Sequence, residues 1–494
     1  MAVEREVSAA DAVVETKYGA LRGSGNEAVR VFRGVPYAAP PVGPLRWRPP
    51  QPLQAWDGVR DALEFGYDCP QQANPLMQSR APGQSEDCLT LSVWTPANAR
   101  TEKLPVMVWF YGGSFVVGSA ANPRFDGEVF ARDGVVYVNV SYRVGIFGFL
   151  AHPGLTAEDP HHFSGNYGIL DQIEALRWIK ENIAGFGGDP DNVTIFGVSS
   201  GAATISLLMV SPLAEGLFQK AILESPGNFR PLAKLADAEE AGRKLGDDIE
   251  ELRQESPEDL LAKQHLLVPA MRGLTTPRIL RAIEDGYVVP EDERELYWSG
   301  RFQAVPAILG TSFDEGTSLT RTWPVDDAPA AERVLEENFG ADPARAKALY
   351  LSNPAVSPRQ AVADMFADTQ FNYGTWSMAR ALAKRQPQTF RYLFSRRRPG
   401  IERGPDHGGE VTYVFKQVAE GDLPFDETDV AVSNAMHDAW LRFANTGDPN
   451  GGDLPTWPAY EESADALLEF GDEIAVRDHY RRDELDFLET YYRG

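Results

Sequence analysis

Residues 192–210 read NVTIFGVSSGAATISLLMV, and this stretch decides the fold. The apolar run Asn192–Phe196 has the composition of a short buried strand. It passes through GVSSG, residues 197–201, into a segment that begins like a helix. A strand, a sharp turn and a helix in succession hold the residue at the tip of the turn in a strained, exposed position. The glycines on either side fit this geometry, because a Cβ there would collide with the tightly turning backbone.

Other strand-like segments surround this stretch. Several are continuously apolar, as in strands that are buried on both faces of a parallel sheet. Before the turn lies a helix over Leu170–Ile183, whose apolar residues recur at helical spacing. The alternation of strand and helix predicts an α/β fold, with a central, mostly parallel sheet flanked by helices. The other predicted strands are Val29–Tyr37, Leu89–Pro96, Leu104–Tyr111, Val135–Arg143, Val305–Gly310 and Thr389–Phe394.

The residue pattern changes from strand-like to mostly helical after Ser225. Residues from about 230 to 300 and from about 327 to 385 are mostly helical in pattern, and we expect them to form insertions over the active site. No Pro- or Ser-rich linker separates them from the strands. We therefore predict a single catalytic domain over residues 1–494.

Composition and charge limit the possible partners. The chain is 43% hydrophobic and 24% charged, which suits a large core, and its net charge is −25. Such an acidic surface repels phosphate backbones, so nucleic acid is a poor partner, and the charge itself is explained by solubility. The two cysteines, Cys69 and Cys88, are too few for a structural zinc site. They could close one short loop or remain free thiols.

The first residues, MAVEREVSAADAVVETKYG, lack a basic start followed by an apolar stretch. We therefore expect no signal peptide and a cytoplasmic location, or secretion if a leader has been removed. No apolar run reaches 18 residues, so we expect no membrane partner.

The glycine-flanked Ser199 is typical of a nucleophile in the α/β-hydrolase fold. The helix that follows favours developing negative charge, although a glycine-rich turn without chemistry is the alternative. Such a serine needs a base, and a carboxylate that precedes the base in the chain. His407 lies in the glycine-rich loop GPDHGGE after a predicted strand, although a loop histidine can be an ordinary surface residue. The other histidines after Ser199 lie in helical patterns or a charged tail: His265, His437 and His479.

The carboxylate and the oxyanion donors come from loops that follow predicted strands. In VPAILGTSFDEGTS, Asp314 and Glu315 follow a strand, and their positions alone do not choose between them. An acidic loop on an acidic protein is the alternative. The strand VMVWF is followed by YGGS, residues 111–114. The backbone N–H groups of this loop could bind an oxyanion together with the N–H of Ser200. A plain turn without a catalytic role would have the same sequence pattern.

Several long motifs, in order, resemble the type-B carboxylesterase family, which also holds the cholinesterases. They run over nearly the whole chain: residues 31–50 (VFRGVPYAAPPVGPLRWRPP), 85–94 (SEDCLTLSVW), 106–115 (VMVWFYGGSF), 142–151 (YRVGIFGFLA), 165–202, 314–318 (DEGTS) and 406–415 (DHGGEVTYVF). The resemblance implies a catalytic triad of Ser199, Glu315 and His407, and so selects Glu315 over Asp314. It also implies an oxyanion hole of Gly113, Ser114 and Ser200, and a disulfide between Cys69 and Cys88. No cofactor or metal is implied.

Three positions depart from the usual pattern of that family, which has Glu at Val198, Gly at Ser114 and Ala at Ser200. Val198 removes a carboxylate beside the nucleophile, which puts choline-type cation binding in doubt. Ser200 should be harmless, because only its backbone N–H is used. Ser114 adds a side chain where the acyl group would lie, and we expect it to narrow the acyl pocket or to add a hydrogen bond. We expect Val198 and Phe115 to contact the substrate.

The predicted function is therefore a serine carboxylesterase that acts on a small-molecule ester as a monomer or homodimer. Residues 222–242, 283–289 and 367–374 resemble bacterial fumonisin-degrading carboxylesterases, which cleave tricarballylate esters. Arginine side chains bind carboxylates well, so a polyanionic acyl group is expected to contact arginine. Arg272, Arg278 and Arg281 lie in the predicted helical insertion and are candidates, although they could be ordinary surface arginines. An amidase or carbamate hydrolase could use the same triad, and a non-catalytic binding module could share the fold.

Overall fold

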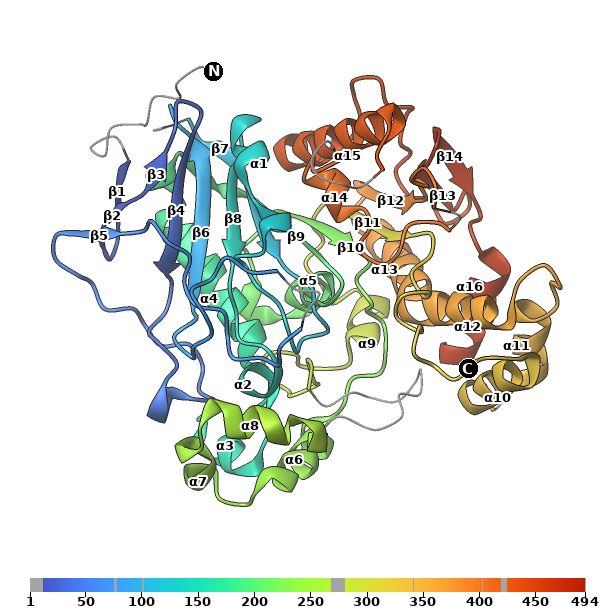
Figure 1. Cartoon of the computed structure of the whole chain (residues 1–494), viewed down its shortest axis with the longest axis horizontal. Coiled ribbons are helices and arrows are strands. Elements are labelled where there is room, and N and C mark those ends of the chain that lie inside the picture. The colour runs from blue at the N-terminus through green and yellow to red at the C-terminus, as the bar shows by residue number, and fades with distance from the viewer. Residues whose placement is uncertain are drawn as a thin grey trace.

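A computed structural model describes residues 12–74, 78–99, 102–267, 280–340, 342–401, 403–418 and 424–493. Its main feature is a large twisted sheet with the strand order β14-β13-β12-β11-β10-β9-β7-β8-β6-β4-β3 (Figure 1). All neighbouring strands from β13 to β8 are parallel, and the pairs at the two ends are antiparallel. This confirms the predicted α/β fold with a mostly parallel sheet. The small sheet β1-β2-β5 packs at one side.

Seven strands follow the predicted segments closely: β4, β6, β7, β8, β9, β11 and β12. The sequence does not predict β1, β2, β3, β5, β10, β13 and β14. The strand bounds are β1 Val13–Thr16, β2 Gly19–Arg22, β3 Ser24–Gly25, β4 Val29–Pro36, β5 Val59–Asp61, β6 Thr90–Pro96, β7 Leu104–Phe110, β8 Val136–Val140, β9 Gly188–Val198, β10 Lys220–Glu224, β11 Ala307–Ser312, β12 Thr389–Phe394, β13 Ala466–Phe470 and β14 Ile474–Asp478.

Helices cover the sheet and extend beyond its edges (Figure 1). Their bounds are α1 Glu128–Arg132, α2 Gly145–Phe149, α3 Pro153–Glu158, α4 Tyr167–Asn182, α5 Ser200–Val210, α6 Leu235–Gly242, α7 Ile249–Gln254, α8 Pro257–Lys263, α9 Glu293–Trp298, α10 Ala328–Asn338, α11 Pro343–Tyr350, α12 Pro358–Ala367, α13 Tyr373–Ala383, α14 Val411–Val414, α15 Glu427–Thr446 and α16 Arg482–Arg493.

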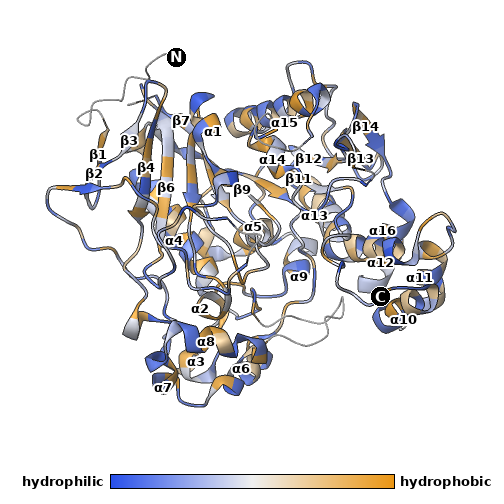
Figure 2. Ribbon diagram, in the orientation of Figure 1, coloured by the Kyte–Doolittle hydropathy of each residue, from blue (hydrophilic) through white to orange (hydrophobic). Residues whose placement is uncertain are grey.

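The core lies on both faces of the sheet. Strands β8, β10, β11 and β12 are buried at every position, and apolar residues concentrate along the strands (Figure 2). Helix α5 is also buried along its whole length. Because the parallel strands end at one edge of the sheet, the loops after β7, β9, β11 and β12 meet there. These loops carry the residues predicted to be functional.

The two predicted helical subregions are helical in large part, with one difference. Residues 268–279 lie outside the described part of the chain. Residues 280–292 form a loop rather than a helix, because Asp285 Oδ1 accepts the N–H groups of Tyr287, Val288 and Val289 in a tight turn. In the second subregion, a π-helical turn over Asp368–Asn372 separates α12 from α13. The single-domain organisation remains a prediction.

In the structure the sulfurs of Cys69 and Cys88 are bonded, with their Cα atoms 5.1 Å apart. None of the helices in the described ranges is long and apolar enough to cross a membrane. Among the same residues, no group of three or more His, Cys, Asp or Glu side chains is arranged to hold a metal ion.

Candidate active site

Ser199 lies at the tip of the turn between β9 and α5. Its backbone has φ 58° and ψ −123°, a strained conformation for a residue with a side chain. The Ser199 N–H donates to the carbonyl of Glu224 on β10 at 2.9 Å, which fixes the turn. A Cβ on Gly197 or Gly201 would lie 2.4 Å or 2.0 Å from the Phe110 carbonyl oxygen. The two glycines therefore allow the turn to pack against the end of β7, as the sequence predicts.

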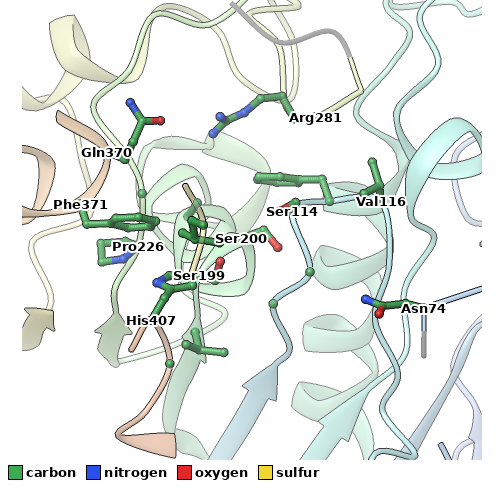
Figure 3. Close-up of a pocket in the computed structure, with 18 of the residues that line it drawn as sticks. Asn74, Ser114, Val116, Ser199, Ser200, Pro226, Arg281, Gln370, Phe371 and His407 are labelled. Atoms are coloured by element: carbon green, nitrogen blue, oxygen red, sulfur yellow. The ribbon is translucent and has the colours of Figure 1, made fainter. Parts of the chain in front are cut away.

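His407 lies in the loop after β12, and its Nδ1 is hydrogen-bonded to Glu315 Oε2. Its ring packs against that of Phe371, with centroids 4.5 Å apart, and its side chain is 12% exposed. Ser199 and His407 line the same pocket, and Figure 3 shows their side chains next to each other at its floor. The structure thus brings together two residues that are far apart in the chain.

Glu315, rather than its neighbour Asp314, reaches the histidine. The Glu315 carboxylate is fully buried, and its Oε1 accepts the Ser312 N–H at 2.7 Å and the Ser225 hydroxyl. Asp314 instead accepts a hydrogen bond from Thr317, and its backbone pairs with that of Asp406. This backbone bridge ties the loop after β11 to the histidine loop.

The electrostatics of His407 suit a base that gains a proton during the reaction. Burial lowers the pKa of its imidazole, but the negative charge of Glu315 and the hydrogen bond to it raise this pKa by more. The net effect is a pKa above the ordinary value of 6.5 for histidine. Glu315 therefore stabilises the imidazolium form.

The predicted oxyanion donors share one pocket with Ser199. Gly113, Ser114 and Phe115 all have positive φ, of 137°, 57° and 67°, so the loop after β7 curls over the pocket. Within the described residues, the N–H groups of Gly113 and Ser114 donate to no backbone carbonyl. The N–H of Ser200 is at the N-terminus of α5, where a helix leaves its amides unpaired. All three residues line the pocket with Ser199.

The pocket has a volume of about 400 Å³, and it is lined by Val198 and Phe115, the two residues expected to contact the substrate. Arg281 also lines it, whereas Arg272 and Arg278 lie outside the described residues. The described lining contains no Asp or Glu. The lining also includes residues that the sequence does not predict, among them Arg124, Arg230, Trp323, and Gln370 and Phe371 of the π-helical turn.

The other candidate histidines are engaged elsewhere. His437 is buried on α15 between the Val414 carbonyl and Asp133, and His265 contacts the Ala262 carbonyl near the end of α8. His479 lies at the end of β14, in the charged tail of the sequence. None of the three is among the described residues that line the pocket.

Known proteins resemble this chain in sequence and in fold. The model of the carboxylesterase family matches residues 10–488. The chain is 40% identical over 471 residues to fumonisin B1 esterase of Sphingopyxis macrogoltabida, covering 94% of this chain and 87% of the relative. It is 34% identical to para-nitrobenzyl esterase of Bacillus subtilis (strain 168), covering 94% and 96%. A solved structure of PNB esterase superposes with a TM-score of 0.84 at 32% identity, covering 96% and 99%.

A family model that spans almost the whole chain and a solved esterase of the same fold identify the family without reference to any single residue. The chain therefore belongs to the carboxylesterase family and is a carboxylic ester hydrolase.

Proposed function

We propose that Ser199, His407 and Glu315 carry out ester hydrolysis through an acyl-enzyme. His407 takes the Ser199 hydroxyl proton, and Ser199 Oγ attacks the ester carbonyl carbon. The N–H groups of Gly113, Ser114 and Ser200 hold the oxyanion of the tetrahedral intermediate. The alcohol leaves with the proton from His407, and water then repeats the sequence on the acyl-enzyme. The observation that carries the proposal is the buried Glu315–His407 bond behind the pocket that Ser199 also lines.

The test is hydrolysis of a neutral p-nitrophenyl ester by the wild type and by Ser199→Ala. We expect kcat to fall on the order of 10⁶-fold in the variant. Ser211→Ala, which removes a buried serine hydroxyl at the other end of α5, is a matched control and should keep its activity. Retention of most activity by Ser199→Ala would refute the proposal.

A second observation favours substrates that carry a carboxylate. The Arg281 side chain is only 7% exposed, its Nε has no hydrogen-bond partner, and it has no ion pair within the described residues. Its guanidinium lies over the Phe115 ring at 5.1 Å, across the pocket from Ser199 (Figure 3). Its nearest acid is the buried Glu293, which acts on it only through space. A buried guanidinium with no carboxylate in direct contact is unfavourable until an anion binds it.

We propose that this anion is a carboxylate on the acyl group of the ester, as in a tricarballylate ester. The name of the fumonisin B1 esterase relative is consistent with this class of substrate. The absence of Asp and Glu from the described pocket lining supports it, because an anionic substrate would meet no repulsion there. Arg124 and Arg230 add positive charge to the same walls.

Paired substrates test this second proposal: a half-ester with one free carboxylate, and the corresponding neutral diester. Arg281→Gln should raise KM for the half-ester about tenfold or more, since hydrogen bonds to charged groups contribute roughly 1.5–3 kcal/mol, and should spare the diester. Arg385→Gln removes another arginine that stacks on a phenylalanine, Phe302, neither of which lines the pocket, and is the control. Equal effects of Arg281→Gln on both substrates would contradict the proposal.

A further inference from the structure

Behind the triad lies a row of three buried carboxyl groups, of which the proposed mechanism uses one. Glu315, Glu410 and Glu224 are each fully buried. Glu410 follows His407 by three residues at the start of α14, and Glu224 ends β10. Among the described residues, the only direct ion pair to any of the three is that of His407 with Glu315. Three buried negative charges in a row would repel each other strongly, so they cannot all be ionised.

Two serines join Glu410 to Glu315. Ser312 donates its N–H to Glu315 Oε1 at 2.7 Å and its hydroxyl to Glu410 Oε2 at 3.0 Å. The Ser225 hydroxyl lies within hydrogen-bond distance of both carboxyl groups, closely at Glu315 Oε1 and at 3.4 Å from Glu410 Oε1. Ser225 has a single hydroxyl proton, and the close bond to Glu315 takes it. The contact with Glu410 is therefore attractive when Glu410 supplies the proton.

We propose that Glu410 is a positioning residue that keeps its own proton and, through Ser225 and Ser312, holds the Glu315 carboxylate against His407. The inference rests on the proposed triad. A neutral Glu410 satisfies the Ser225 oxygen, accepts the Ser312 and Tyr392 hydroxyls, and adds no second charge beside Glu315. The negative charge then stays on the carboxylate that faces the imidazole.

The groups around Glu410 agree with a neutral acid. Glu315 faces it from the loop after β11, Glu224 from β10, Tyr392 from β12, and His407 from its own loop. Burial, followed by the charge of Glu315, raises the pKa of Glu410 above its ordinary value.

Two neighbouring groups leave this picture unchanged. The charge of Arg124 acts on Glu410 through space, but its hydrogen bond goes to the Gly408 carbonyl, and the pKa of Glu410 remains raised. Glu224 Oε1 accepts a hydrogen bond from the indole N–H of Trp440 at 2.9 Å, and burial raises the pKa of Glu224 well above the usual range. The direction of this shift favours the neutral form of Glu224, as burial does for Glu410.

The experiment compares Glu410→Gln, an isostere of the neutral acid, with Glu410→Met, which fills the space without hydrogen bonds. The kcat and KM for a neutral p-nitrophenyl ester are measured from pH 5 to 9. We expect Glu410→Gln to keep the wild-type kcat and acid limb. Glu410→Met should lower kcat on the order of 10²-fold with KM unchanged, as misplacement of a catalytic group does. Glu293→Gln, at another buried carboxyl that accepts a serine hydroxyl (that of Ser206) but has no bond to the triad or to its two serines, is the control and should match the wild type.

Two outcomes would overturn the proposal. If Glu410→Gln moves the acid limb to lower pH, Glu410 is ionised and acts on His407 by its charge. If Glu410→Met keeps the wild-type kcat, Glu410 has no positioning role. Infrared difference spectra give an independent readout, because the carboxylic-acid C=O band of Glu410 should vanish in a folded Glu410→Gln protein. Failure of the triad itself would appear instead as activity in Ser199→Ala.

Discussion

At the scale of single residues, the distinctive position is Ser114 in the proposed oxyanion loop. Its φ of 57° is in the left-handed region, and its side chain is exposed to the pocket. This region costs a residue with a Cβ roughly 1–2 kcal/mol, whereas glycine adopts it freely. A serine therefore occupies a strained position where glycine would not be strained, next to the place where an acyl group would lie.

Ser114→Gly should therefore shift activity toward longer acyl chains. The change relieves backbone strain but gives the unfolded chain more freedom, so the free energy of unfolding should change by less than about 1 kcal/mol. The measurement is kcat/KM over a series of p-nitrophenyl esters from acetate to long-chain acyl groups. An unchanged chain-length preference would show that Ser114 does not limit the acyl pocket.

The Glu315–His407 bond predicts the direction in which the pH dependence of kcat/KM should change when Glu315 loses its charge. Only neutral imidazole accepts the serine proton, so kcat/KM should fall at acidic pH with an apparent pKa above 6.5. Glu315→Gln removes the charge that stabilises the imidazolium, so its acid limb should move to lower pH. Its kcat should also fall by about 10⁴-fold, as when the orienting carboxylate of such a triad is lost. If the acid limb of Glu315→Gln stays at the wild-type pH, the charge of Glu315 does not act on the pKa of His407, which would contradict this account.

At the scale of elements, the loop from Cys69 to Cys88 is closed by a disulfide. A cross-link over this sequence separation of 19 should stabilise the fold by about 3 kcal/mol, mainly by restricting the unfolded chain. Cys69→Ser with Cys88→Ser should lower the free energy of unfolding by that amount in denaturant titrations. Addition of a reductant to the wild type should have the same effect and none on the double variant. A double variant as stable as the oxidised wild type would contradict this.

The sequence predicts the strands better than the loops that shape the pocket. Continuous apolar runs such as residues 106–110 and 192–196 mark buried strands, and GVSSG marks the turn, because local sterics dictate both. Asp314 and Glu315 share one loop, and contacts made in the folded chain fix which of them reaches His407: the backbone bridge from Asp314 to Asp406 and the hydrogen bond from Ser225 to Glu315. Arg281 lies in a loop rather than in the predicted helix, because the turn around Asp285 leaves little trace in the periodicity. The π-helical turn before Tyr373 is not predicted either, because one such turn between two α-helices barely changes the helical spacing of apolar residues.

At the scale of the whole molecule, buried acids link stability to pH. Glu293 at the start of α9 is 2% exposed, and burial raises its pKa to about 7. In the unfolded chain this carboxyl ionises near its ordinary value of 4.5, so between pH 4.5 and 7 the folded protein binds the additional proton. Its contribution to the free energy of unfolding is therefore fully present below pH 4.5 and falls as pH rises toward 7.

Glu293→Gln keeps an acceptor for the Phe229 N–H and removes this titration. The free energy of unfolding of the wild type, minus that of the variant, should fall by about 3 kcal/mol between pH 4.5 and 7. Guanidinium titrations at several pH values measure it. A difference that is constant with pH would mean that Glu293 is ionised throughout the range.

The central claim is that Ser199 is the nucleophile of this carboxylesterase. The most direct measurement is intact-protein and peptide mass spectrometry after treatment with a p-nitrophenyl alkylphosphonate, which traps an activated serine covalently. We predict one phosphonyl group per chain, located on Ser199, with loss of esterase activity in proportion to labelling and no label on Ser199→Ala. Complete inactivation with the label on another residue, or no label on a fully active enzyme, would contradict the claim.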